Sequence, residues 1–155
     1  MSRKKARDVS MRLLFARSIG GQDDHPEILA LMEEMRDSDL NDDDSAYIDR
    51  VTVGVEEKSD ELDKWINRFA VRWNTERMSK VDLTILRLAL YEILYDPSIP
   101  ASVSINEAVA LSHTYSTEEA GPFINGILGQ CARAVSLGIK DPDTLAADQQ
   151  HSEKE

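Results

Sequence analysis

The stretch Val81-Asp-Leu-Thr-Ile-Leu-Arg-Leu-Ala-Leu-Tyr-Glu92 decides the fold class of this chain. Apolar residues in and just after it cover nearly the whole circumference of a helix that extends to about Tyr95. A helix that is apolar on every side has to be surrounded by other helices, so we expect this segment to be the central element of the core. Ser79 stands where an N-cap residue is expected, and Pro97 and Pro100 enforce a break after the helix.

The segments before and after this helix repeat apolar residues at helical spacing, and none of them alternates convincingly as a strand. One expected helix ends at Gly20-Gly21, and the others begin at Pro26, about Ser45, Ser59, Ser102–Ser104 and Pro122. The polar, acidic run Ser38–Asp44 is expected to be a loop. The chain is therefore predicted to be all-α, with about seven helices.

Three local patterns predict details of packing. The helix that begins at Pro26 has an apolar stripe that consists of Ile28, Leu29, Leu31, Met32 and Met35. Ser104 and Glu107 have the spacing of a capping box. Gly126 lies inside the last helix, where glycine costs about 1 kcal/mol relative to alanine, so we expect another element to pack closely against it.

Length and composition predict one globular unit of structure. The 155 residues, 41% of them hydrophobic, suffice for one domain, which we place at residues 1–139, and the fading apolar pattern predicts a disordered acidic tail at residues 140–155. The single cysteine, Cys131, excludes an internal disulfide and a cysteine metal cluster, and its apolar surroundings predict inert packing. No apolar run approaches the roughly 18 residues that span a bilayer. The N-terminus lacks a signal-peptide core, so we expect a cytoplasmic protein.

The net charge is unevenly distributed along the chain. Residues 1–17 contain six basic residues and one acidic residue, a charge of +5, whereas the whole chain carries −11, so residues 18–155 carry −16. An acidic body repels phosphate backbones, but salt screens distant charges within about 10 Å, so the basic segment could still contact phosphates. Charge alone leaves two alternatives open: an RNA-binding segment, or a helix whose exposed face happens to be basic.

No residue pattern typical of an active site is present. The histidines His25, His113 and His151 have no second ligand at a metal-binding spacing, and no phosphate-binding glycine-rich loop or nucleophile motif occurs. We therefore expect a binding protein with no catalytic residue, metal or cofactor. Tyr115 and Phe123 flank an inter-helix loop, where they either pack the hinge or stack on unpaired bases, at about 1–3 kcal/mol per base.

Several ordered motifs resemble those of the transcription antitermination factor NusB family. The segment Val81–Glu92 resembles the central helix of the family. Three segments follow it in the order and spacing of the family: Ile99-Pro100, Ser104–Leu111 and Phe123–Leu128. The N-terminal Ala6-Arg7-Asp8 with Leu14-Phe15 is similar to the opening of the family, so the resemblance covers about residues 3–136.

This resemblance implies a fold of two packed helical subdomains and a function in transcription. Members of the family bind the single-stranded box A element of nascent ribosomal RNA transcripts together with NusE, a small-subunit ribosomal protein. The complex then helps RNA polymerase to read through terminators. Box A RNA, NusE and the RNA polymerase antitermination complex are therefore the expected partners, and the acidic body suits a basic ribosomal protein.

The resemblance also assigns two sets of site residues. The RNA-binding set comprises an arginine-rich arm and an aromatic loop: Arg3, Lys4, Lys5, Arg7, Tyr115, Glu119 and Phe123. The set that meets NusE comprises Phe15, Glu76, Asp82 and Arg87. Glu119 is expected to weaken RNA binding by like-charge repulsion. Phe15 could instead belong to the core, and Asp82 could serve the helix dipole.

The chain departs from the family pattern near the aromatic loop. Ser112-His113-Thr114 stands where members often carry lysines, Gly121-Pro122 replaces a more polar helix start, and Gly129 replaces a polar residue. Because this leaves fewer cations near the loop, we expect weak RNA binding by the chain alone and tighter binding with NusE.

Other functions stay open at this point. One is a protein-interaction or dimerisation module with little RNA affinity of its own, since some relatives pair with themselves. Another is an accessory RNA-binding domain, because the same fold accompanies RNA methyltransferases, in which case the methyltransferase would be a separate subunit.

Overall fold

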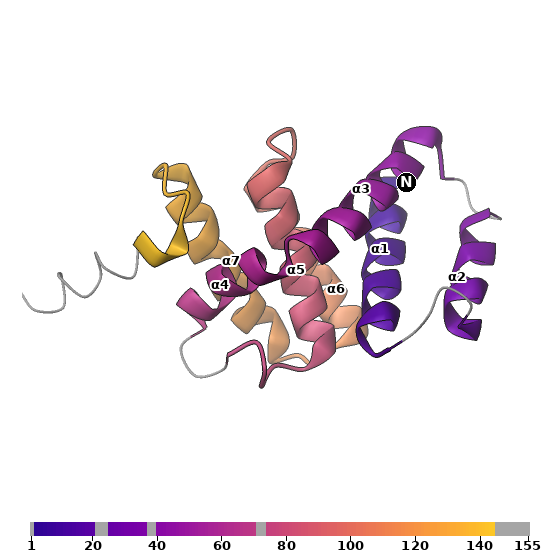
Figure 1. Ribbon diagram of the computed structural model, residues 1–155, viewed down its shortest axis with the longest axis horizontal. Coiled ribbons are helices and arrows are strands. Elements are labelled where there is room, and N and C mark those ends of the chain that lie inside the picture. The colour runs from indigo at the N-terminus through magenta and orange to yellow at the C-terminus, as the bar shows by residue number, and fades with distance from the viewer. Residues whose placement is uncertain (1, 21–24, 37–39, 71–73, 145–155) are drawn as a thin grey trace, which may run out of the picture. The chain divides into compact units, whose positions relative to one another are not determined.

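The computed structural model describes residues 2–20, 25–36, 40–70 and 74–144, and every regular element among them is helical. These residues contain seven helices of eleven residues or more, α1 to α7, so the expected all-α class and helix number are confirmed (Figure 1). The chain divides into two compact units, Met1–Lys58 and Ser59–Glu155. This division agrees with the two helical subdomains that the resemblance implies.

The first unit is built around α1 (Ser2–Ser18), which contacts both α2 (Pro26–Arg36) and α3 (Asp42–Glu57). Figure 1 shows these helices in indigo and purple. α1 stops before Gly20, whose φ of 90° is one that residues with a Cβ rarely adopt. Buried apolar side chains come from all three helices: Val9, Leu14, Ile28, Leu31, Tyr47, Ile48 and Val51.

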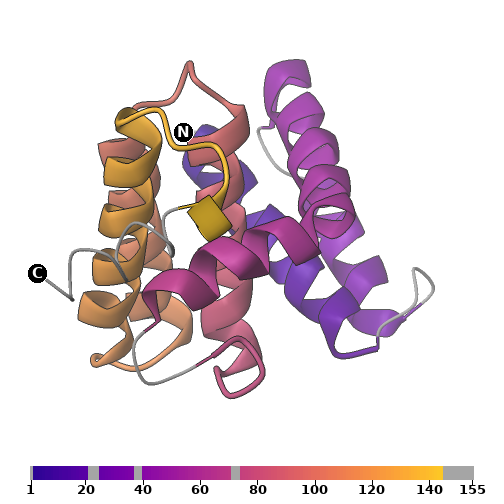
Figure 2. The ribbon, with the colours of Figure 1, turned by 60° about the vertical axis from the view of Figure 1, so that its left-hand side comes forward.

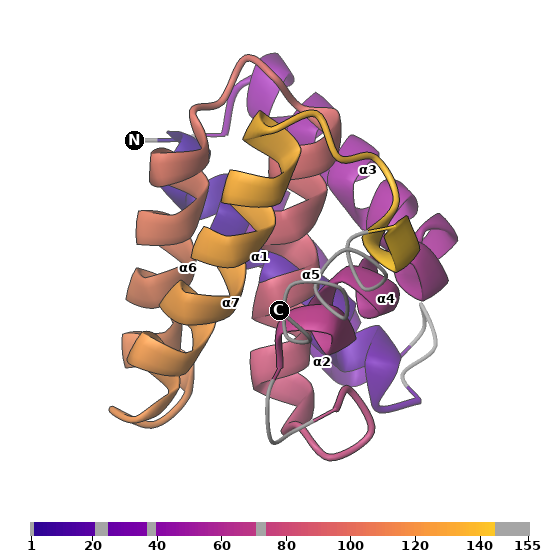
Figure 3. The same cartoon turned by 90° about the vertical axis from the view of Figure 1, so that its left-hand side faces the viewer.

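The second unit is built around α5 (Lys80–Tyr95), which contacts α4 (Ser59–Phe69), α6 (Ala101–Tyr115) and α7 (Ala120–Ser136). Figures 2 and 3 show α6 and α7 side by side and antiparallel. Residues on all sides of α5 are buried, which confirms it as the central helix of this unit. Ser79 caps it as predicted, because its side-chain oxygen accepts a hydrogen bond from the backbone N–H of Asp82 at 3.1 Å.

The predicted loop at Ser38–Asp44 is wrong for its last three residues. Residues 37–39 lie outside the described residues, but α3 already begins at Asp42. Asn41 is its N-cap and accepts a hydrogen bond from the backbone N–H of Asp44 at 2.8 Å. Three aspartates then fill the first turn, where the helix dipole favours carboxylates.

The prediction that Ser104 caps α6 is also wrong. The helix begins three residues earlier, at Ala101, behind Pro100, which makes no side-chain capping bond. Ser104 is buried instead, and its hydroxyl donates to Glu92 Oε1 at 2.9 Å. Glu92 is buried as well, so this hydrogen bond connects α5 and α6 inside the second unit.

Two expectations about packing are contradicted. No atom of another described element lies within 4 Å of the position that a Cβ would take at Gly126. At Gly121, in contrast, a Cβ would lie 3.6 Å from Ser112 Oγ on α6. Leu29, expected in the apolar stripe of α2, is 50% exposed.

The predicted tail is described only in part. A hydrogen bond of 3.2 Å from the backbone N–H of Thr144 to the carbonyl of Asp141 forms one helical turn there. Residues 145–155 lie outside the described residues. Over the part of the chain that the structure covers, no helix is both long enough and apolar enough to cross a membrane.

Candidate nucleic-acid interface

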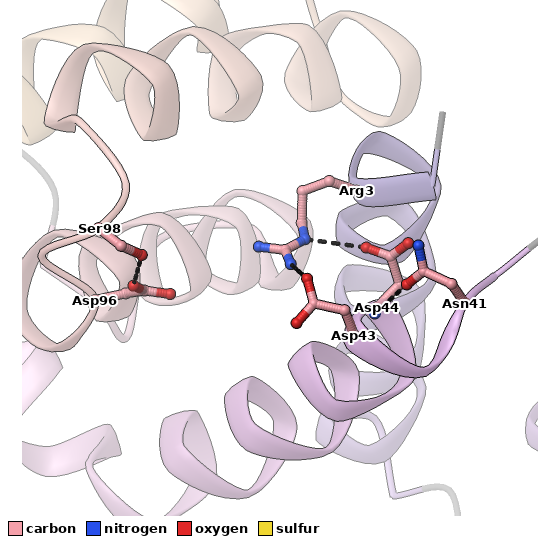
Figure 4. A network of polar contacts seen from close by, with 6 residues as sticks. All are labelled: Arg3, Asn41, Asp43, Asp44, Asp96 and Ser98. Atoms are coloured by element: carbon pink, nitrogen blue, oxygen red, sulfur yellow. Dashed lines mark hydrogen bonds and ion pairs between the residues drawn. The ribbon is translucent and has the colours of Figure 1, made fainter.

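Arg3 on α1 forms ion pairs with two carboxylates in the first turn of α3 (Figure 4). Its Nε donates to Asp44 Oδ1 and its Nη2 donates to Asp43 Oδ2, both at 3.1 Å. The side chain of Asp44 is 3% exposed, whereas that of Asp43 is 86% exposed. Asp44 therefore holds the guanidinium from the interior of the unit, and Asp43 holds it from the solvent side.

The guanidinium groups of three arginines lie close to the ring of Tyr47 on α3. The guanidinium carbon of Arg3 lies 4.5 Å from the ring centroid, that of Arg50 lies 5.7 Å away, and that of Arg7 lies 5.9 Å away. Cations within about 6 Å of a ring centroid are attracted to the face of the ring. Arg7 is only 6% exposed, so its burial favours a role in orienting this cluster over a direct phosphate contact.

Glu34 on α2 binds two more cations of α1. Lys5 Nζ donates to Glu34 Oε1, and Arg12 Nη1 lies 3.1 Å from Glu34 Oε2. The hydrogen bond from Lys5, together with the charge and hydrogen bond of Arg12, holds the pKa of Glu34 below its usual range, although desolvation acts in the opposite direction. The carboxylate is therefore ionised at neutral pH and offsets part of the positive charge of α1.

Most of the described cations of α1 are thus paired with carboxylates from the other two helices of the same unit. Arg17 completes the series, since its Nη1 lies 3.1 Å from Glu56 Oε1 on α3. The partners are 22 to 41 residues apart in sequence, so no local pattern could reveal them. Lys4 is exposed. The structure therefore places all four basic residues of the predicted arm on α1 but leaves their RNA contacts as a proposal.

The second unit has a cavity of about 310 Å³ between the start of α5 and the start of α7. Two predicted RNA residues, Glu119 and Phe123, and one predicted NusE residue, Asp82, line it together. The remaining lining residues are Arg77, Met78, Ser79, Thr117 and Ala120. The cavity thus combines an aromatic ring with one arginine and two carboxylates, a set that offers both stacking and hydrogen bonds to a nucleobase.

A hydrogen bond connects the α6–α7 loop to α5 beside this cavity. The hydroxyl of Ser116 donates to Asp82 Oδ1 at 2.6 Å. Tyr115, the last residue of α6, is 37% exposed and does not line the cavity. Sequence reasoning missed Ser116 and Arg77, because neither belongs to a recognisable pattern and both are brought to the site by tertiary packing.

The residues assigned to NusE fall into different surroundings. Phe15 on α1 is half-buried, and Glu76 before α5 is exposed. Arg87 on α5 makes a two-bond contact with Asp63 on α4, from Nε at 2.8 Å and from Nη2 at 2.6 Å. Such a bidentate pair fixes the orientation of the guanidinium plane.

Two further observations concern metal-binding side chains and the single cysteine. No group of three or more His, Cys, Asp or Glu side chains is arranged there to hold a metal ion. Cys131 is buried, and this burial raises the pKa of its thiol to about 12, in agreement with the predicted packing role.

Comparison with known proteins places this geometry in a family. The NusB family model matches residues 4–133. The transcription antitermination protein NusB of Clostridium novyi (strain NT) is 39% identical over 134 residues, which cover 86% of this chain and 100% of the relative. A protein of the same name from Acetivibrio thermocellus is 42% identical over 133 residues, covering 86% of this chain and 90% of the relative.

Solved structures agree with the sequence matches. T. maritima NusB superimposes with a TM-score of 0.73 at 31% identity, covering 86% of this chain and 92% of that one. A chain in a crystal structure of the antitermination factors NusB and NusE in complex with dsRNA gives a TM-score of 0.72 at 25% identity, covering 85% of this chain and 96% of that one. By its sequence and its fold, this chain belongs to the NusB family.

Proposed function

We propose that this chain is a transcription antitermination factor that binds RNA together with NusE, and that it acts by binding rather than by catalysis. The observation that carries the proposal is its similarity, over 85% of its length, to a chain from the structure of NusB and NusE with RNA. Relatives named as antitermination proteins match over a similar share of the chain.

The RNA in this proposal is the single-stranded box A element of ribosomal RNA transcripts. Cations on α1 supply phosphate contacts, with Arg3, Lys4 and Lys5 as the residues at its start. Phe123 supplies a ring for stacking on an unpaired base, and its place in the lining of a cavity supports this role. Stacking and phosphate contacts hold the single strand, and the polar side chains that line the cavity with Phe123 offer hydrogen bonds that distinguish one unstacked base from another.

NusE meets the chain at Phe15, Glu76, Asp82 and Arg87 in this proposal. Asp82 also lines the cavity and accepts a hydrogen bond from the α6–α7 loop, so it belongs to both sets of residues. A partner bound at Asp82 would therefore lie beside the aromatic RNA site of the second unit. This adjacency supports RNA binding that is stronger in the presence of NusE.

The test is an electrophoretic shift of box A RNA, with a scrambled RNA of equal composition as the control. We expect a complex with box A RNA when NusE is present, and a weaker complex with the scrambled RNA. Arg3→Ala and Phe123→Ala should each reduce the shift, whereas Arg133→Ala, which removes an exposed cation of α7 outside the cavity, should not. Absence of any box A complex, with or without NusE, would exclude the proposal and leave a protein-interaction or dimerisation module.

A further inference from the structure

Two cations of the arginine-rich arm on α1 are bound by carboxylates of α2 and α3. Arg3 Nη2 contacts Asp43 Oδ2, and Lys5 Nζ contacts Glu34 Oε1. Both cations belong to the set assigned to RNA phosphates. A carboxylate and a phosphate present the same kind of oxygen to a guanidinium or an ammonium group, so they compete for the same N–H donors.

We propose that the carboxylates of Asp43 and Glu34 occupy the positions that RNA phosphates take on Arg3 and Lys5, so that RNA has to displace them in order to bind. This inference rests on the proposed function, because it assumes that the α1 arm contacts RNA. It adds to that function an internal competitor, supplied by α2 and α3, which lowers the RNA affinity of the chain.

The two carboxylates on Arg3 differ in how easily they can be displaced. Asp44 is buried and holds Nε, so it fixes the arginine in place and is not open to exchange. Asp43 is almost fully exposed and holds Nη2, so its side chain can turn into water when a phosphate arrives. Figure 4 shows dashed lines from the guanidinium of Arg3 to each of these two carboxylates.

Glu34 is similarly accessible, with 40% of its side chain exposed. It accepts hydrogen bonds from both Lys5 and Arg12, so its loss would release two cations of the same helix. Exposed ion pairs contribute little each, and the exchange of a carboxylate for a phosphate is therefore within reach of a bound RNA.

The experiment compares each competing acid with a neighbouring acid on the same helix that forms no ion pair with α1 among the described residues. Asp43→Asn is matched by Asp42→Asn in the same first turn of α3, and Glu34→Gln is matched by Glu33→Gln on α2. Within each pair, both variants remove one negative charge, and they remove it at adjacent positions of the same helix. Affinity for single-stranded box A RNA is measured by fluorescence anisotropy, with NusE present and the full chain throughout.

We expect Asp43→Asn and Glu34→Gln each to tighten RNA binding by about two- to fivefold, the range that exposed ion pairs correspond to. The matched variants should change affinity by less than about 1.5-fold, because salt screens charges that make no direct contact. The gain from Asp43→Asn should also disappear in an Arg3→Ala background, since the two residues then no longer interact.

Equal effects of Asp43→Asn and Asp42→Asn, or a gain that persists without Arg3, would overturn the inference, because either result shows only the general effect of removing a negative charge. These results leave the proposed function intact, since the wild-type chain still binds box A RNA. Failure of every variant and of the wild-type chain to bind box A RNA, with or without NusE, would instead overturn the proposed function, and the inference with it.

Discussion

Glu119 places a negative charge beside the ring that we assign to RNA, because it lines the same cavity as Phe123. Removal of this charge should favour an approaching phosphate. We predict that Glu119→Gln raises the affinity for box A RNA by about two- to fivefold, the scale of one solvent-exposed charge interaction. A filter-binding titration would measure the change.

Glu118 provides the control for this substitution. It is the preceding residue and is also exposed, but it does not line the cavity. Glu118→Gln should therefore have a clearly smaller effect on RNA affinity. If both substitutions raise affinity equally, the cavity has no special part in RNA binding.

Arg3 and Arg7 belong to the same predicted arm, but their exposure differs. Each phosphate contact that is lost should reduce the slope of log affinity against log salt concentration by about 0.7 for single strands. We predict this reduction for Arg3→Ala. Arg7 is buried against Tyr47, so Arg7→Ala should leave the slope unchanged and instead lower the thermal stability of the chain. An equal change of slope in the two variants would show that Arg7 contacts phosphate after all.

At the scale of helices, Ser104 joins α6 to α5 through a buried hydrogen bond to Glu92. Ser104→Ala removes the donor while the carboxylate stays buried, so it should lower the free energy of unfolding by about 1–3 kcal/mol. Ser102→Ala, in the same first turn but exposed, should change it by less than about 0.5 kcal/mol. Urea unfolding of the three proteins measures both values, and equal stabilities would contradict the account.

The contact of α2 with α1 should depend on pH through Glu34. Because its pKa is lowered from 4.5 in the folded chain, its ion pairs stabilise the fold above pH 4.5 and lose this effect as the pH falls through the lower folded value. We predict that the melting temperature of wild type exceeds that of Glu34→Gln at pH 7, and that the difference shrinks toward pH 3. Glu33→Gln is the control, and a pH-independent difference for Glu34→Gln would contradict the prediction.

Local sequence signals predicted where the helices lie in the chain better than they predicted which helices contact one another. The apolar circumference of α5 identified it as a helix, and Gly20, Pro26 and Ser79 marked where helices end or begin. These signals were readable because each depends only on residues close to it in sequence. The acidic run that ends at Asp44 misled the prediction, because aspartates are typical of a solvated loop but also of the first turn of a helix, here α3 behind Asn41. Sequence spacing alone could not distinguish these two cases.

The candidate site was predictable only as a set of residues. The resemblance assigned Arg3 and Lys5 to RNA, but their carboxylate partners lie 29 to 41 residues away and became visible only in the folded chain. Likewise, Asp82 on α5, Glu119 just before α7 and Phe123 on α7 are brought to one cavity by the fold. Tertiary packing therefore decides which residues share a surface and which carry a competing charge.

At the scale of the whole molecule, the structure shows how the uneven charge of the chain is balanced. The +5 segment is not an isolated basic tail, because carboxylates of α2 and α3 bind its cations within the first unit. The second unit adds the acidic residues Asp82 and Glu119 around the candidate stacking site. In the proposed function, both units therefore combine groups that would attract RNA with carboxylates that would repel it, and this combination favours a protein that binds RNA together with a partner.

The measurement that tests this account most directly is a titration of fluorescent box A RNA with the wild-type chain, alone and with saturating NusE, at one fixed salt concentration. The account predicts weak binding by the chain alone and affinity that is higher by roughly tenfold or more with NusE, equivalent to about 1.4 kcal/mol. Equal affinities in the two titrations, or binding that does not distinguish box A RNA from a scrambled sequence when NusE is present, would contradict it.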